Sequence, residues 1–146
     1  MQSVLDYFTT DHRGCDSLWA KAEGALEKND GGAKAAFEAF DAAMRRHFAM
    51  EEELLFPAIE ERTGMVDQGP TAVMRMEHEQ MRGVLDQMAQ ALEKGDHQAA
   101  LDQGDTLLML IQQHNIKEEG VLYPMADQVL GEGWEALAGQ LKHFEG

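Results

Sequence analysis

Histidine and glutamate recur at fixed spacings in this sequence. The stretch HFAMEEELLFP at 47–57 has a counterpart in HNIKEEGVLYP at 114–124. Both fit one pattern: His, three residues, Glu-Glu, one residue, an aliphatic residue, Leu, an aromatic residue and Pro. On a helix the His and the first Glu, four residues apart, share one face. Because imidazole and carboxylate groups are common ligands of transition metals, the doubled pattern predicts metal chemistry.

Two further histidines extend the doubling, in the pairs Asp11-His12 and Glu77-His78. The chain therefore divides into two predicted helical hairpins, about 10–62 and 70–130, each giving a single His and then a His-Glu pair. Six residues are the predicted metal ligands: His12, His47, Glu51, His78, His114 and Glu118.

Apolar residues at helical spacing surround these six positions, and Met109 and Val121 are predicted to belong to the same buried faces. A buried carboxylate without a partner is very costly. Four imidazoles and two carboxylates in one core can be satisfied together by metal, and two cations would offset the buried negative charge. The alternative is a metal-free structural bundle in which these groups satisfy one another.

The helices that must position these residues are separated by four groups of helix breakers, at 29–32, 63–70, 94–97 and 131–133. We predict an all-α fold, an up-down-up-down four-helix bundle in one domain spanning 1–146. Pro57 and Pro124 should bend or end their helices. The first predicted helix spans 11–27, with Thr10 as its N-cap and a short helical turn before it at 3–8. The next three span 33–62, 70–94, which begins at Pro70, and 96–130, which has Asp96 as its N-cap. A short amphipathic tail helix is predicted at 134–144.

Charge and composition limit the possible partners and location. The formal net charge is −15, from 12 basic and 27 acidic residues, which disfavours binding to nucleic acid or anionic membranes. No apolar run approaches the roughly 20 residues of a membrane span, and no signal-peptide pattern begins the chain. The single cysteine, Cys15, suits a reducing compartment, so we expect a cytoplasmic protein.

Four motifs together resemble the hemerythrin family, specifically the bacterial HHE cation-binding domains. They are DH at 11–12, HxxxEExLLFP at 47–57, EHExMR at 77–82 and HxxxEExVLYP at 114–124. The ferritin-type Glu-x-x-His motif and the zinc-protease motif HExxH are both absent.

The resemblance implies a non-haem di-iron centre, completed by an oxo or hydroxo bridge. In the family's pattern His12 and His47 would bind one iron and His78 and His114 the other, while Glu51 and Glu118 would bridge the two.

The sequence departs from the oxygen-carrying members at Arg82, where those have a second His, and it is similar to a subgroup with HxxxR. Those members also use an Asp five residues after the last His, where this chain has Glu119. An arginine stays protonated and cannot be a ligand. Arg82 either points toward the site, pairing with a bridging Glu or holding an anion, or reaches solvent or a surface acid. The open metal position would take water, Glu52, Glu79 or Glu119.

The cysteine, the two tyrosines and the two remaining histidines are not expected to bind the metal. Cys15 is expected to be a buried, inert thiol, with redox activity as the alternative. Tyr7 and Tyr123 are expected to pack in the core rather than reach the metal. His97 and His143 are expected to be exposed and not to bind metal.

These inferences predict a di-iron protein that binds or responds to dioxygen, nitric oxide or peroxide, by oxygen binding or redox sensing. The alternatives are a di-iron enzyme with peroxidase, catalase-like or nitric oxide-reducing activity, and an iron-handling or regulatory protein. No appended signalling domain is recognisable, so a regulatory role would require a separate partner chain. The sequence identifies neither that chain nor a catalytic residue, and other divalent metals would suit the same ligands.

Overall fold

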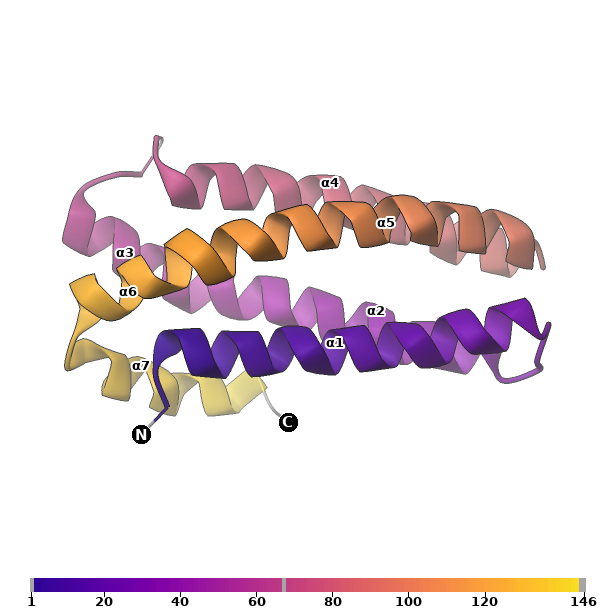
Figure 1. Cartoon of the computed structure of the whole chain (residues 1–146), viewed down its shortest axis with the longest axis horizontal. Helices are drawn as coiled ribbons and strands as arrows, with labels where there is room; N and C mark the ends of the chain where they lie inside the picture. Colours follow the sequence, from indigo (N-terminus) through magenta and orange to yellow (C-terminus); the bar gives the residue numbers. More distant parts are fainter. Residues whose placement is uncertain (1, 67, 145–146) are drawn as a thin grey trace.

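Four long helices form the body of the molecule. The computed structural model describes residues 2–66 and 68–144. The long helices are α1 (Val4–Glu27), α2 (Ala33–Met50), α4 (Pro70–Glu93) and α5 (His97–Lys117). They run alternately up and down (Figure 1), and α1 packs against α2 and α5 while α4 packs against α5 and α2. Within the described residues no strand occurs, so the predicted all-α bundle is confirmed.

Shorter helices close one end of the bundle. They are α3 (Phe56–Thr63), α6 (Tyr123–Leu130), α7 (Gly133–Leu141) and the 3-10 turn η3 (Lys142–Phe144). The predicted tail helix therefore forms, and Figure 1 shows it lying at the end of the bundle where α3 and α6 also lie. Of the helices described, none is long and apolar enough to cross a membrane.

The first helix begins earlier than the sequence suggested. Ser3 caps α1 with a capping box, in which its hydroxyl accepts from the Asp6 amide and the Asp6 carboxylate accepts from the Ser3 amide. The Asp127 carboxylate also accepts from the amide of Val4 at 2.7 Å. The prediction of Thr10 as N-cap after a separate turn at 3–8 was wrong, because these caps satisfy the free amides about two turns earlier. The predicted N-cap Asp96 is confirmed, since it accepts from the Ala99 amide at 3.0 Å.

Two π-helical turns interrupt the long helices at matching places. These are η1 (Glu51–Leu55) after α2 and η2 (Glu118–Leu122) after α5. Each begins at a predicted bridging Glu and ends two residues before a proline, which has no amide hydrogen to continue the α-helical bonding. The amides of Phe56 and Tyr123 bond instead to the carbonyls of Glu51 and Glu118, five residues back.

The π turn also explains an error in the predicted core. Its wider turn changes the helical register, so Leu122 is buried whereas Val121 is 60% exposed. Met109, also predicted to be buried, is 53% exposed because it lies two residues from both Leu107 and Ile111 and so faces away from them.

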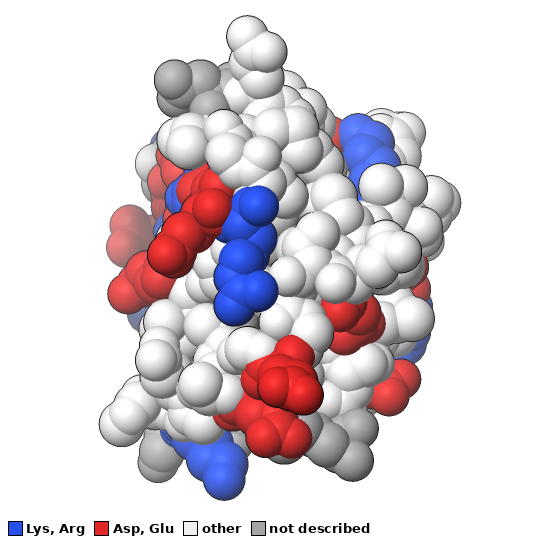
Figure 2. Space-filling model, turned by 90° about the vertical axis from the view of Figure 1, so that its left-hand side faces the viewer, with Lys and Arg blue, Asp and Glu red and all other residues white. Residues whose placement is uncertain are grey.

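The buried apolar residues form two clusters. One contains Trp19, Phe40 and Met88 from α1, α2 and α4, and the other contains Phe8 and Trp134 near the end closed by the short helices. Figure 2 shows that end: neutral side chains cover most of the visible face, and acidic and basic side chains form small groups among them. The predicted metal ligands are absent from both clusters although they are buried.

Candidate metal centre

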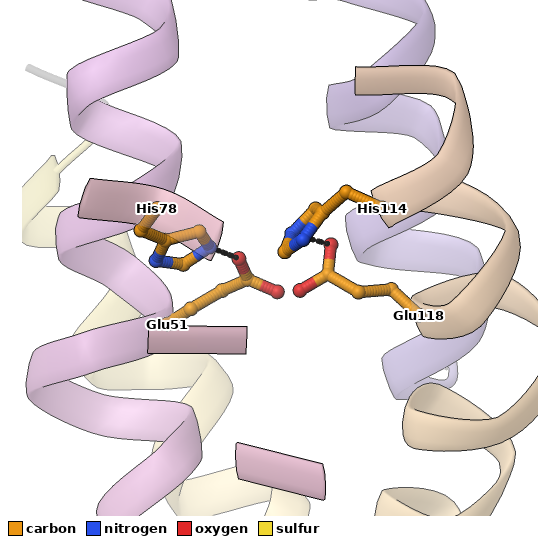
Figure 3. Close-up of side chains that lie close together, drawn as sticks. All are labelled: Glu51, His78, His114 and Glu118. Carbon is orange, nitrogen blue, oxygen red and sulfur yellow. Dashed lines mark ion pairs between the residues drawn. The ribbon is translucent and has the colours of Figure 1, made fainter. Parts of the chain in front are cut away.

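The six predicted ligands are all brought together inside the bundle. None is more than 4% exposed. Each long helix supplies one histidine, and each π turn supplies one glutamate. Figure 3 shows His78 and His114 from opposite sides of the site, with the carboxylates of Glu51 and Glu118 turned toward each other between them.

The ligand atoms form two overlapping groups. Glu51, His78, His114 and Glu118 make the first, and His12, His47 and Glu118 make the second; within each, the ligand atoms lie within 4.8 Å of one another. The His78 Nε2 atom lies 3.1 Å from Glu51 Oε1, and His114 Nε2 lies 3.2 Å from Glu118 Oε1 (Figure 3). Glu118 belongs to both groups, so it is placed to join two metal positions.

Each histidine is oriented by a second carboxylate on its outer nitrogen. The Nδ1 atoms of the four histidines lie 2.6–2.8 Å from these acids. A carboxylate at Nδ1 holds the proton there and leaves the Nε2 lone pair free, which is the usual arrangement of a metal-binding imidazole. The pairs are His12 with Glu119, His47 with Asp11, His78 with Glu52 and His114 with Glu77.

A cation accompanies each of these four acids. Arg13 donates to Glu119 at 2.8 Å and Arg82 to Glu52 at 2.8 Å. The other two pairs are Arg46 with Asp11 and Lys117 with Glu77. The site thus has four outward chains of histidine, carboxylate and cation, one from each long helix.

Arg82 stands in one of these chains and does not contact the two central carboxylates. Its guanidinium donates to Glu52 and to the exposed Glu79, and lies 5.2 Å from the ring centroid of Phe48. The interpretation that Arg82 pairs with Glu51 or Glu118 was wrong. It pairs with a surface acid and, through Glu52, supports His78.

The candidates for an extra ligand also have other partners. Glu52 and Glu119 hold the outer nitrogens of His78 and His12, and Glu79 is 72% exposed. Burial on its own would raise the pKa of Glu52, but hydrogen bonds from His78 and Arg82 outweigh it and hold that pKa at about 2. Glu52 is therefore an anion that supports His78.

Four atoms at the centre have no partner in good hydrogen-bond geometry among the described residues, although His78 Nε2 and Glu51 Oε1 lie 3.1 Å apart. They are Glu51 Oε1, His78 Nε2, His114 Nε2 and Glu118 Oε2. Buried polar atoms are rarely left unpaired, because the lost hydration costs about 1–3 kcal/mol for each. All four are good ligand atoms and all face the same space, so the residues present fit a bound metal ion.

Charge at the centre favours a cation in the same way. Burial opposes the charged form of His47, but Glu51 and hydrogen bonds to Asp11 and Glu118 raise its pKa well above its usual value. Burial would raise the pKa of Glu118, but hydrogen bonds at the centre hold it well below its usual value. Two buried carboxylates thus attract positive charge, which a metal ion would supply.

Tyr123 reaches the centre, contrary to the prediction that it only packs the core. Its hydroxyl lies 2.7 Å from Glu51 Oε2, 2.8 Å from Glu118 Oε1 and 3.1 Å from His12 Nε2. Burial and then the charges of Glu118 and Glu51 raise its pKa well above its usual value, so it is a protonated donor. The repeat contains a sequence sign of this contact, because Tyr123 stands where the first copy has Phe56.

The remaining candidates lie outside the ligand groups. Cys15 is buried as predicted, and burial raises the pKa of its thiol to about 11, so the thiol is protonated. His143 is exposed as predicted, whereas His97 is half-buried at the start of α5. Tyr7 lies near Met50 and Trp134, away from the centre.

Fold and site together define a helical-bundle protein with a buried cluster of histidines and glutamates that could hold metal ions. The family model described as the hemerythrin HHE cation binding domain matches residues 3–126. The chain therefore belongs to the hemerythrin family of HHE cation-binding domains, as its motifs indicated. Comparison with curated proteins gave no match, and neither did comparison with solved structures.

Proposed function

We propose that this protein holds two iron ions and uses them to bind or respond to dioxygen, nitric oxide or peroxide. His12 and His47 hold one ion, His78 and His114 hold the other, and the carboxylates of Glu51 and Glu118 bridge them. The observation that carries this proposal is the set of unpartnered, buried ligand atoms facing one space. Family membership supports it, because these domains bind cations and typically iron.

Bound iron would supply one-electron chemistry and an open position for a small oxidant. The chain's own residues would do the rest. The outer acids fix the proton on each Nδ1, and the apolar clusters on either side of the centre keep bulk water away. We predict that the protein carries out this function in the cytoplasm.

Tyr123 favours enzymatic turnover as a second candidate. Its protonated hydroxyl can donate a hydrogen bond to either carboxylate, at 2.7 Å to Glu51 or 2.8 Å to Glu118, so it holds a proton beside the buried centre. A peroxidase-like or nitric oxide-reducing activity requires protons at the centre, whereas reversible binding does not. Many turnovers for each pair of metal ions would establish the enzyme.

The direct test is metal analysis of protein purified without chelator, with absorption spectra recorded before and after anaerobic reduction and return to air. The proposal predicts about two irons per chain. It also predicts a ligand-to-iron band that fades on reduction and returns in air. Protein without stoichiometric metal, folded as described here, would overturn the proposal.

A further inference from the structure

The surface that α4 and α5 turn toward solvent includes a large uncharged region. The two helices lie side by side (Figure 1). Gln80 and Gln113 line one hollow of about 50 Å³ between them, and both are exposed. Exposed residues at spacings of three, four and seven continue this surface along each helix. We call the following six residues the uncharged face: Met76, Gln80 and Gln87 of α4, and Met109, Gln113 and Ile116 of α5.

The charged side chains next to this face are directed away from it or paired. Asp86 of α4 pairs with Arg45 of α2 at 2.7 Å. At the border of the face, Glu77 of α4 and Lys117 of α5 form an ion pair, so their charges offset each other. The outer surfaces of α1 and α2 differ, because charged side chains are exposed along them: Arg13, Asp16, Lys21, Lys34, Glu38 and Arg46.

The uncharged face also exposes large apolar side chains. Ile116 is 73% exposed, Met76 is 55% exposed and Met109 is 53% exposed. Met109 is the middle residue of LLMLI at 107–111, so this part of α5 is apolar on its outer side as well as on its core side. A helix that is apolar all round is normally buried, and an exposed apolar patch marks a site of interaction. Something is therefore expected to cover this face.

Charge identifies a second copy of the chain as the best occupant. A basic partner would be attracted to the acidic side chains elsewhere and not to this face. Two copies each carry a formal net charge of −15, so they repel each other wherever charged surfaces meet, and contact through this face avoids such meetings. A glutamine amide both donates and accepts, so Gln80, Gln87 and Gln113 can bond to the same residues of another copy. A two-fold symmetric contact needs a self-complementary surface of this kind.

The size of the surface fits a weak dimer. Residues 73–87 of α4 span about 20 Å along the helix axis, and two helices side by side are about 20 Å wide. Contact over this region would bury on the order of 1,000 Å² of accessible surface on the two copies together, the lower end of the range for specific interfaces. An interface of this size gives a dissociation constant on the order of 10 μM.

We propose that two copies of this chain associate through their uncharged faces, with α4 and α5 of one copy packed against α4 and α5 of the other across a two-fold axis. The contact buries Met76, Met109 and Ile116 and lies outside the ligand groups. It therefore goes beyond the proposed function, and it can be tested whether or not the protein holds iron.

Sedimentation equilibrium of the full-length protein is the first test. The average mass should rise with concentration from 16.3 kDa toward twice that value. Because the two copies repel each other and salt screens this repulsion, association should become about tenfold tighter between about 10 mM and 300 mM salt. A mass that stays at 16.3 kDa at about 1 mM protein in high salt would overturn the proposal. Association that weakens with salt would also overturn it, because it would show contact between opposite charges.

Charge placed on the face tests where the contact lies. Gln80→Glu with Gln113→Glu should weaken association about a hundredfold, because like charges then meet across the two-fold axis. Gln128→Glu with Gln140→Glu adds the same charge at exposed positions of α6 and α7, and it is the matched control. Circular dichroism checks the fold of each variant. Equal weakening in the two double variants would overturn the proposed face.

A variant of opposite charge makes this test more specific. Gln80→Lys with Gln113→Lys should also weaken self-association. A mixture with the glutamate variant should restore dimers, because opposite charges then meet across the contact. A mixture that remains monomeric would overturn the proposal.

Methionine methyl NMR locates the contact in the wild-type protein. A soluble nitroxide relaxes exposed methyl groups, so dimers should protect Met76 and Met109 at high protein concentration by about threefold relative to dilute protein. Met65 is 39% exposed outside the uncharged face, and its relaxation should not change. Equal protection of the three methyl groups, or protection of none, would overturn the proposed face.

Discussion

The two helical hairpins provide the same ligands but different surroundings. Each gives two histidines, a glutamate that begins a π turn, and the outer acids that hold the histidines. Among the matching positions that differ, three lie close to the histidines or to their outer acids. The first hairpin has Asp16, Phe48 and Phe56 where the second has Arg82, Asn115 and Tyr123. The residues that the two hairpins share form the proposed centre, and the residues that differ set the surroundings of each side.

The difference gives each proposed metal position its own environment. The His12 and His47 side has the Tyr123 hydroxyl, which lies 3.1 Å from the Nε2 atom of His12 and 3.4 Å from that of His47. The His78 side has the rings of Phe48 and Phe56, with centroids 4.3 and 5.6 Å from that of His78. One proposed metal position therefore lies in a polar half of the centre and the other in an apolar half.

Replacement of Glu51 or Glu118, the two proposed bridging residues, should cause the largest loss of metal, and the loss should differ between the two variants. Glu118 belongs to both ligand groups, whereas Glu51 belongs to one and reaches the other only through His47, whose Nε2 lies 3.3 Å from Glu51 Oε1. Glu118→Gln should therefore reduce bound metal from about two to less than one per chain, and Glu51→Gln should retain more. Metal analysis with circular dichroism as a folding control measures this. Equal metal loss in the two variants would contradict the ranking.

Removal of an outer acid should weaken one half of the centre. Glu52→Gln removes the acceptor of His78, and Asp11→Asn removes that of His47. Each should lower the affinity of the metal on its own side by roughly 10–100-fold. Titration of metal-free protein with Fe²⁺ or Zn²⁺ would show one weakened site of two. Glu79→Gln, which changes an exposed acid, is the control and should leave both affinities unchanged.

Exchange at the matching pair Phe56 and Tyr123 should alter the polar half of the centre without loss of metal. Tyr123→Phe removes a hydroxyl from Glu51 and Glu118, and we expect the metal-free protein to lose about 1–3 kcal/mol of stability through the unpaired acceptors. Metal content should stay near that of the wild type. Denaturant unfolding measures the loss, and an unchanged midpoint would show that the hydroxyl is dispensable.

Phe56→Tyr places the same hydroxyl on the apolar half. If the difference between the halves arises from this hydroxyl, the double exchange of Phe56 and Tyr123 should transfer the spectral signature of the polar half to the other metal. If the spectrum changes with neither substitution, the difference between the halves arises from Phe48 and Arg82 instead.

The smallest expected effect is a pH dependence at Glu52. Its pKa is about 2 in the folded protein, below the ordinary 4.5, so it stabilises the fold above pH 4.5 and loses this contribution as the pH falls toward 2. Because the side chain is partly solvated, the loss should be modest. Thermal unfolding of metal-free wild type and Glu52→Gln between pH 5 and pH 2.5 should show a shallower decline in the variant.

The repeat made it predictable from sequence that the six proposed ligands would cluster in the core. A His and a Glu four residues apart must share a helix face, and two copies with a single His before each define a centre that four helices can surround. Fold class and the burial of the six residues followed from this pattern.

The features that sequence did not predict depend on contacts between distant segments. The outer acids Asp11 and Glu77 precede one histidine but bind another on the next helix, so spacing along one helix does not reveal them. Asp127 helps to begin α1 from the far end of the chain. The prolines indicated a bend, but the π turns that change the register of Val121 depend on backbone bonding that a proline alone does not specify.

The most direct test is a crystal structure with anomalous scattering measured on both sides of the iron absorption edge. The account predicts two iron peaks about 3.5–4 Å apart. One should lie at Nε2 of His12 and His47, the other at Nε2 of His78 and His114, with Glu118 in contact with both. A single peak, or peaks outside this cluster, would contradict the claim that the duplicated hairpins build one two-metal centre.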